Sequence, residues 1–257
     1  MTTMLTISPT AIPTVRDPER DLISNTGRAI ANFDLISAGD RIMVALSGGK
    51  DSYALLLLLE AMRRRAPVKF ELLAVHLDQG QPGHSPEPLR AWLAGNGFEH
   101  RIVREDTYAI VKETVPEGRT PCSMCARLRR AILYRFADEF GCTKIALGHH
   151  RDDALETLLL NLFFGGKLAS MPARLTSDDG AHVVIRPLIY CAEQDLADFA
   201  ASRKVPILPC NLCGSLPNAQ RKQMKSLLTK MEAEHPNLRQ TMLAALGNVH
   251  MSHLLAR

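Results

Sequence analysis

The stretch Leu46-Ser47-Gly48-Gly49-Lys50-Asp51-Ser52 decides the fold, because it joins a predicted strand, Arg41–Leu46, to a predicted helix at about 51–65. Two adjacent glycines let the backbone adopt positive φ and approach an anion closely. The first turn of the following helix has unpaired N–H groups that favour negative charge. The context therefore predicts a phosphate-binding turn.

Three polar side chains can add to this turn. Ser47 and Ser52 can donate from their hydroxyl groups, and Lys50 can supply a positive charge. Asp51 is unusual in a simple phosphate turn, so it either holds a magnesium ion or caps the helix. The stretch matches neither the G-x-x-x-x-G-K-[ST] loop nor the G-x-G-x-x-G dinucleotide turn.

Short apolar runs alternate with amphipathic stretches over most of the chain, which predicts an α/β fold with a parallel sheet of about five strands flanked by helices. A small helical C-terminal extension follows Pro206, with Pro236 between two helices. We expect this extension to pack on the main body. The predicted strands are 41–46, 71–77, 100–104, 144–147 and 183–187; the predicted helices are 19–33, 51–65, 86–94, 126–140, 152–164 and 192–203. The predicted parts are an N-terminal helical segment, 1–40, a nucleotide-binding domain, 41–208, and the extension, 209–257.

Composition sets broad limits on the chain. Its 257 residues are 46% hydrophobic, contain no apolar run long enough to span a bilayer and begin without a secretory signal. We therefore expect a cytoplasmic protein. A net charge of +4 is too small to indicate nucleic-acid binding by itself. Basic residues do follow each cysteine pair, either to contact phosphates or as solvated helix faces: Arg127, Arg129 and Arg130, then Arg221, Lys222 and Lys225.

A second polar cluster, Gly148-His-His-Arg-Asp-Asp153, follows the predicted strand 144–147 and opens the next helix. Asp152 or Asp153 is placed to cap that helix, or to give a carboxylate to Mg²⁺ on a triphosphate. His149 and its neighbours can face the nucleotide. Asp78, at the end of the strand 71–77, lies on the same rim of the sheet.

Four of the six cysteines form two Cys-x-x-Cys pairs, Cys122–Cys125 and Cys210–Cys213. Two such pairs suit a tetrahedral zinc site, which spacing alone favours. They equally suit an iron–sulfur cluster, or a catalytic thiol that carries sulfur. Cys142 and Cys191 stand alone, and we expect both to be structural.

The stretch Ser47–Ser52 resembles the signature of the PP-loop ATP pyrophosphatases, which cleave ATP between the α and β phosphates and adenylate a carbonyl oxygen. In that family the first strand lies beside the fourth, which would bring Gly148–Asp153 next to the turn. The resemblance implies that ATP is bound by Ser47, Gly48, Gly49, Lys50, Asp51, Ser52, Gly148, His149 and Asp152, together with Mg²⁺.

Further motifs resemble the bacterial tRNA 2-thiocytidine synthetase family over about 28–250. They are Pro121-Cys-Ser-Met-Cys125, Gly148–Asp153, Gly165-Gly-Lys167, Met171-Pro172 and Pro209-Cys-Asn-Leu-Cys-Gly-Ser215. Members hold a [4Fe–4S] cluster through three cysteines, leave one iron open for sulfide, and thiolate cytidine 32 of the anticodon loop. Carried over, the ligands are Cys122, Cys125 and Cys213, with Cys210 as the alternative third ligand.

This resemblance implies a reaction and its partners. ATP adenylates the C2 oxygen of cytidine 32 in tRNA, and sulfur then replaces that oxygen. Asp51, Asp153 and Cys213 are the expected catalytic residues. The expected partners are tRNA, a sulfur donor such as a cysteine desulfurase, and a second copy of the chain in a homodimer.

Two other functions remain open on the sequence. One is a related thiolase that acts on a uridine or on another acceptor. The other is a non-catalytic, nucleotide-binding module associated with RNA, in which the cysteines hold structural zinc.

Overall fold

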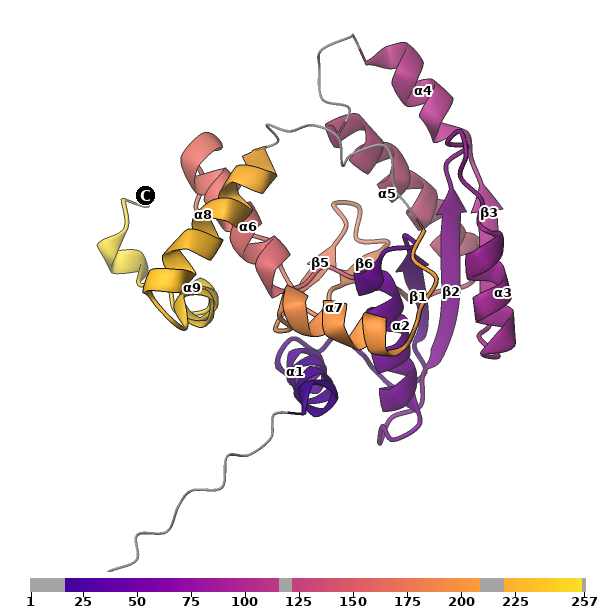
Figure 1. The fold of residues 1–257 in the computed structure, drawn as a ribbon, viewed down its shortest axis with the longest axis horizontal. Helices are drawn as coiled ribbons and strands as arrows, with labels where there is room; N and C mark the ends of the chain where they lie inside the picture. The colour runs from indigo at the N-terminus through magenta and orange to yellow at the C-terminus, as the bar shows by residue number, and fades with distance from the viewer. Residues whose placement is uncertain (1–16, 116–121, 209–219, 256–257) are drawn as a thin grey trace, which may run out of the picture.

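Within the described residues, the sheet has six strands in the order β3-β2-β1-β4-β6-β5. The structure, a computed structural model, describes residues 17–115, 122–208 and 220–255 (Figure 1). Five strands run parallel, and only β5 runs antiparallel, beside β6. The strands are β1 (Arg41–Leu46), β2 (Glu71–Asp78), β3 (His100–Arg104), β4 (Lys144–Ala146), β5 (Arg174–Thr176) and β6 (Val183–Ile185).

The predicted α/β class and its five parallel strands are confirmed, and β5 is the addition. Its three residues are all exposed, so β5 has no apolar pattern that could have predicted it. A short helix, α4 (Thr107–Thr114), was also not predicted. Helix α5 (Cys122–Glu139) begins four residues earlier than expected. The first cysteine pair therefore lies in the first turn of a helix.

Residues of β1 alternate between two apolar layers. Ile42, Val44 and Leu46 pack into the larger layer, whereas Met43 packs into the smaller one. The larger layer is covered by α1 (Pro18–Asn32), α2 (Lys50–Arg63), α3 (Glu87–Gly95) and α7 (Glu193–Ser202), and α5 covers the smaller one. Apolar residues therefore fill both faces of the sheet, as expected for parallel strands.

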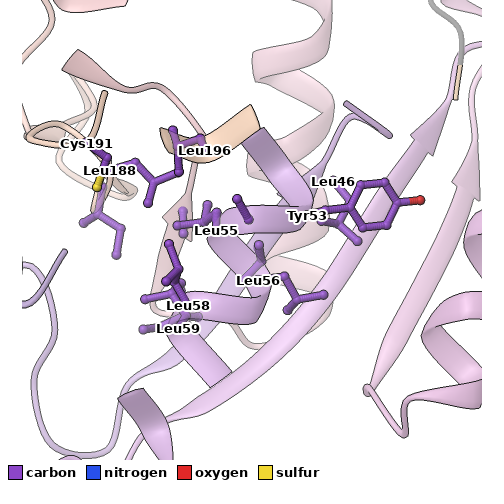
Figure 2. Packing of buried hydrophobic residues seen from close by; sticks show 14 of the residues in the cluster. Leu46, Tyr53, Leu55, Leu56, Leu58, Leu59, Leu188, Cys191 and Leu196 are labelled. Atoms are coloured by element: carbon purple, nitrogen blue, oxygen red, sulfur yellow. The ribbon is translucent and has the colours of Figure 1, made fainter. Parts of the chain in front are cut away.

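Helix α2 forms the centre of the larger layer (Figure 2). Leu55, Leu56, Leu58 and Leu59 are all essentially inaccessible to solvent. Cys191 is buried in the same layer, and burial raises the pKa of its thiol to about 11. A protonated, inaccessible thiol agrees with the structural role predicted for Cys191.

The described part of the C-terminal extension, 220–255, packs on helix α6 (Arg151–Phe164), in agreement with the expected packing on the main body (Figure 1). Helices α8 (Gln220–Glu234) and α9 (Leu238–Leu246) share a third apolar cluster with α6, formed by Leu155, Leu159, Met224 and Leu228. A short 3₁₀ helix follows at Met251–His253. The domain boundaries given above stay predictions.

Strand β1 pairs with β2 on one side and with β4 on the other. The strand order therefore reverses beside β1, and ligands of open α/β sheets bind at the carboxyl ends of strands at such a point. The turn after β1 and the turn after β4 meet there, as expected. Among the described residues, no helix has the length and apolar character needed to cross a membrane.

Candidate active site

Serine hydroxyl groups hydrogen-bond to the backbone of the turn between β1 and α2. Ser47 Oγ accepts from the Gly49 N–H at 3.3 Å, and Ser52 Oγ donates to the Gly49 carbonyl at 2.8 Å. Gly49 is the N-cap residue, and no side chain in the described part of the chain caps α2. The N-terminus of α2 therefore keeps the positive end of its dipole available to an anion.

Gly48 is needed in this turn for two reasons. Its φ is +83°, and a Cβ at this position would lie 2.8 Å from the Leu208 Cβ. The Leu208 N–H donates to the Gly48 carbonyl at 2.9 Å, and the Tyr53 hydroxyl donates to the Pro206 carbonyl at 2.8 Å. The end of the predicted nucleotide-binding domain thus packs directly on the turn.

Gly148 lets the second turn touch the first. A Cβ on Gly148 would lie 3.1 Å from the carbonyl carbon and oxygen of Asp51. A side chain there would force the two turns apart, because such Cβ contacts are tighter than normal packing allows. The structure therefore brings Gly148 and Asp51 together, from positions about a hundred residues apart.

Helix α6 is capped by its own side chains. His150 is the N-cap residue: its Nδ1 accepts from the Asp153 N–H at 3.4 Å, while Asp153 Oδ2 accepts from the His150 N–H at 3.2 Å. Asp153 thus takes part in the cap, but the N-cap position belongs to His150 and not to an aspartate. His150 was expected only to face the nucleotide, as a neighbour of His149, and its role as the N-cap residue was not predicted.

The same histidine brings two carboxylates together. Because His150 Nδ1 accepts from the Asp153 N–H, Nε2 is the ring nitrogen that can donate. His150 Nε2 lies 3.4 Å from Asp153 Oδ2 and 3.9 Å from Asp51 Oδ2. Asp51 and Asp153, the two predicted catalytic carboxylates, therefore converge on one point beside the α2 N-terminus.

Asp152 is buried and its oxygens are already engaged. It accepts from the Glu193 N–H at 2.8 Å and from Arg151 at 3.3 Å, and it pairs with Arg239. Burial opposes the charge, but Arg151, the Glu193 N–H and Arg239 hold the pKa of Asp152 below its ordinary value. Asp152 connects α6 with α7 and α9, and its predicted contact with the nucleotide stays a prediction.

Cationic side chains of α2 and α8 surround these carboxylates. Lys50 Nζ lies 3.0 Å from Asp51 Oδ1 and 3.3 Å from Glu193 Oε1. Lys225 Nζ lies 2.6 Å from Glu193 Oε2. Arg221 Nη1 lies 3.0 Å from Asp153 Oδ1 and 3.3 Å from a buried carboxylate of Glu156. Two of the basic residues that were candidates for RNA contact are therefore paired with site carboxylates here.

A cavity of about 650 Å³ extends from both turns toward α5 and β6. His149 lines it, and His149 Nδ1 accepts from Arg186 Nε at 3.2 Å. Burial and the neighbouring Arg186 lower the pKa of His149 to about 4, so the ring is neutral at pH 7. Other lining residues are Ser47, Asp51, Ser52, Arg129, Arg130, Tyr134, Gly148 and Asp153.

Only part of the predicted cysteine site can be placed. Cys125 is half-buried, and its Sγ donates to Gln79 Oε1 at 3.6 Å. Gln79 follows β2, so this thiol lies near the rim of strand ends that carries the two turns. The Cys122 side chain, Cys210 and Cys213 lie outside the described residues, and their roles as ligands stay predictions.

Asp78, the other predicted rim residue, forms a local hydrogen bond. Asp78 Oδ1 accepts from the Gly80 N–H at 3.0 Å. His76 is buried in β2, with its Nδ1 2.8 Å from the Leu46 carbonyl oxygen. No group of three or more His, Cys, Asp or Glu side chains in the described residues is arranged to hold a metal ion. A magnesium ion at Asp51 and Asp153 would need further oxygens, which the phosphates of a nucleotide provide.

Comparison with known proteins agrees with this arrangement. Residues 20–208 match the PP-loop domain family. The chain is 60% identical over 235 residues to a tRNA-cytidine(32) 2-sulfurtransferase of Sorangium cellulosum, covering 91% of this chain and 83% of the relative. It is 56% identical over 236 residues to the protein of the same name in Yersinia pestis, covering 92% and 75%.

A solved structure has the same fold. The U34-tRNA thiolase NcsA from Methanococcus maripaludis, described with its [4Fe–4S] cluster, matches with a TM-score of 0.70 over 92% of this chain and 80% of that one. At 22% identity this similarity establishes the fold alone. The sequence matches go further, and the resemblance to both families is confirmed: the chain belongs to the PP-loop domain family and, within it, to the tRNA-cytidine(32) 2-sulfurtransferases.

Proposed function

We propose that this protein is an ATP-dependent tRNA thiolase that converts cytidine 32 to 2-thiocytidine. The observation that carries this proposal is the meeting of an uncapped α2 N-terminus with two convergent carboxylates, Asp51 and Asp153, in a chain of this family. The α2 amides can hold phosphate oxygens, and the carboxylates can hold the cation that accompanies them.

The first chemical task is to turn the C2 oxygen of the base into a leaving group. That oxygen attacks the α-phosphorus of ATP, the bond to the β-phosphate oxygen breaks, and pyrophosphate leaves. The α2 N–H groups and the hydroxyl groups of Ser47 and Ser52 stabilise the charge that moves onto the departing phosphates. Lys50, now paired with Asp51, is close enough to join them.

The second task is the replacement of the activated oxygen. Sulfide adds to C2, the C2–O bond breaks, and AMP leaves with that oxygen, so no electrons are gained or lost. Water would compete for the same carbon, and the C2 carbon must therefore react inside the cavity that His149 and Arg186 line. The target base must leave its stack to enter, which a loop allows more easily than a duplex.

Magnesium fits the carboxylates of Asp51 and Asp153, since it prefers one or two carboxylates together with phosphate oxygens. Before the nucleotide arrives, Asp51 is paired with Lys50, and Asp153 accepts from the His150 N–H and pairs with Arg221. When bound, magnesium neutralises charge on the leaving pyrophosphate.

The position of the Cys125 thiol supports a [4Fe–4S] cluster at this site. Cys125 is a thiol on the first turn of α5, and Ala126 of the same turn lines the reaction cavity. The proposed ligands are Cys122, Cys125 and Cys213, with Cys210 as the alternative. When bound, the cluster supplies sulfide to the activated carbon. The remaining partners that we propose are a sulfur donor such as a cysteine desulfurase and a second copy of the chain, in the cytoplasm.

Nucleoside analysis of tRNA from a strain that lacks this protein tests the proposal. We expect 2-thiocytidine to disappear and to return with the wild-type gene, but not with Asp51→Asn. Unchanged 2-thiocytidine in a strain without a paralogue would contradict the proposal. Loss of a thiouridine instead would support the alternative acceptor. Zinc without iron or sulfide in anaerobically purified protein would support the non-catalytic alternative.

A further inference from the structure

Arg186 is a buried cation without a carboxylate partner among the described residues. Only 8% of the residue is exposed. Its Nε donates to the neutral ring of His149 at 3.2 Å, and its Nη1 donates to the Pro172 carbonyl at 2.7 Å. Buried arginines are normally paired with an acidic group, because removing an unpaired charge from water is unfavourable. Neither partner of Arg186 supplies a negative charge.

Two more guanidinium groups lie on the same cavity. Arg129 and Arg130, one turn after Cys125 in α5, line it together with Arg186. Neither forms an ion pair with a carboxylate in the part of the chain that the structure describes. Burial and repulsion by Arg130 lower the pKa of Arg186, so these charges are close enough to oppose one another. Asp153 is a described carboxylate that attracts Arg186, and Arg221 is already paired with it.

We propose that Arg186, with Arg129 and Arg130, forms a phosphate-binding subsite in this cavity, distinct from the phosphate turn at the N-terminus of α2. The planar guanidinium group of arginine matches the oxygens of a phosphate in a two-point contact. His149 and the Pro172 carbonyl hold Nε and Nη1, which fixes the plane of the Arg186 guanidinium group before the anion binds.

The expected source of this phosphate is the RNA backbone beside the target nucleotide. The triphosphate of ATP already has the α2 amides, Ser47, Ser52 and Lys50 for its oxygens. A base that reaches the α-phosphate brings its own phosphodiester into the cavity, where Arg186 would neutralise it. This inference rests on the proposed function, and a nucleotide phosphate is the other source that the experiment distinguishes.

The test compares Arg186→Gln with Arg186→Lys in the full-length protein. Anticodon stem-loop RNA is titrated by fluorescence anisotropy over a range of salt concentrations, and a non-hydrolysable ATP analogue with Mg²⁺ is titrated in parallel. Loss of one phosphate contact lowers the slope of log K against log salt by about 0.7–0.9. We expect the slope to fall by this amount in Arg186→Gln and to stay unchanged in Arg186→Lys. Neither variant should change the affinity for the ATP analogue.

Arg41→Gln is the matched control, because Arg41 is a half-buried arginine at the start of β1 that, unlike Arg186, pairs with Glu71 and Glu99 at 2.6 Å. It should leave RNA binding unchanged. Arg130→Gln, on the exposed side of α5, repeats the test without loss of a buried contact and should also lower the slope. If Arg186→Gln fails to fold, Arg130→Gln and Arg186→Lys still decide the matter.

Each outcome is informative. If Arg186→Gln binds the ATP analogue more weakly but binds RNA as wild type does, the subsite is supported and its ligand is a nucleotide phosphate. Unchanged binding of both ligands in Arg186→Gln and Arg130→Gln, with wild-type protein that binds both, overturns the inference alone. The inference is also overturned if Arg186→Gln and Arg186→Lys lose RNA affinity equally and in proportion to their fall in melting temperature. Arg186 would then act only by holding the backbone at Pro172. Wild-type protein that binds neither ligand contradicts the proposed function as well.

Discussion

The N-termini of α2 and α6 follow neighbouring parallel strands and touch each other, yet their backbone amides are satisfied in different ways. Gly49 begins α2 without a capping side chain, whereas His150 and Asp153 close the start of α6 in a reciprocal pair. One end is left free for an anion, and the other is satisfied by the protein itself. Both ends meet at the reversal of strand order, but only the α2 end is built to bind phosphate.

The acidic residues near the two helix ends also differ in their exposure. Asp51 and Asp153 remain partly exposed beside the free end, with side-chain exposures of 27% and 22%. Asp152, adjacent in sequence to Asp153, is only 4% exposed and is bound by two arginines and an amide. Of these neighbouring carboxylates on one helix, Asp152 is therefore enclosed by protein partners, whereas Asp153 stays partly accessible.

The largest effect expected is on stability, from Asp152→Ala. This change removes the buried carboxylate that Arg239 and Arg151 share and leaves Glu232 as the carboxylate partner of Arg239. Breaking a buried pair lowers the free energy of unfolding by about 3–5 kcal/mol. Chemical denaturation measures the loss. The folded variant should keep its affinity for an ATP analogue. A clear drop in that affinity with unchanged stability would instead place Asp152 at the nucleotide, as the sequence predicts.

The next effect is on the reaction rate, from Asp51→Asn. Removing one carboxylate from the proposed magnesium site should slow pyrophosphate release by about 100-fold or more in a single turnover. The melting temperature should change little, because Asp51 is partly exposed and the α2 end needs no cap from it. Normal release of pyrophosphate by this variant would remove Asp51 from the chemistry.

Glu156, on α6 beyond its capped end, should make stability depend on pH. Burial, together with repulsion by Asp153, raises its pKa from 4.5 to about 7 although Arg221 opposes the change. Because the folded pKa lies above the unfolded one, this carboxyl stabilises the fold fully below about pH 4.5, and that contribution is lost as pH rises through 7. Glu156→Gln should remove this pH-dependent decrease in the free energy of unfolding, which is on the order of 1–3 kcal/mol.

Denaturation of wild type and Glu156→Gln at pH 5 and at pH 7.5 checks this prediction. His149, whose pKa is lowered to about 4, acts in the opposite direction, so only the difference between the two proteins isolates Glu156. Glu87→Gln, at an exposed position on α3, is the control. Parallel pH profiles for wild type and Glu156→Gln would show that Glu156 ionises normally.

The smallest effect separates the two glycines of the phosphate turn. Gly48→Ala puts a Cβ at positive φ and 2.8 Å from the Leu208 Cβ. This should lower the free energy of unfolding by about 1–3 kcal/mol and weaken binding of the ATP analogue. Gly49→Ala is the matched control, because φ there is −85° and the nearest atom to its Cβ is 3.4 Å away. Equal losses in the two variants would mean that the turn is not strained at Gly48.

Much of this arrangement could be predicted from the sequence, because it depends on local pattern. Apolar runs located five of the six strands, and glycines between β1 and α2 located the phosphate turn. The short exposed strand β5 carries no such pattern. The start of helix α5 at Cys122 was not predicted, because helix boundaries also depend on contacts that lie outside the local motif.

Partners distant in sequence could not be predicted. Asp152 meets Arg239 across 87 positions, and Arg186 meets His149 across 37. Arg186 follows β6 as a single arginine with no motif around it, so nothing in the sequence distinguished it from an exposed one. Only the fold shows that it is buried and lines the same cavity as the phosphate turn.

The central claim, that the α2 end binds the phosphates and the α6 end does not, can be tested directly by NMR. Amide resonances of ¹⁵N-labelled protein are followed while a non-hydrolysable ATP analogue and Mg²⁺ are added. The account predicts large shifts for Gly48, Gly49, Lys50 and Asp51, with smaller ones for Arg151 and Asp152, whose helix end is capped. Large shifts at the α6 amides with the α2 amides unchanged would contradict it.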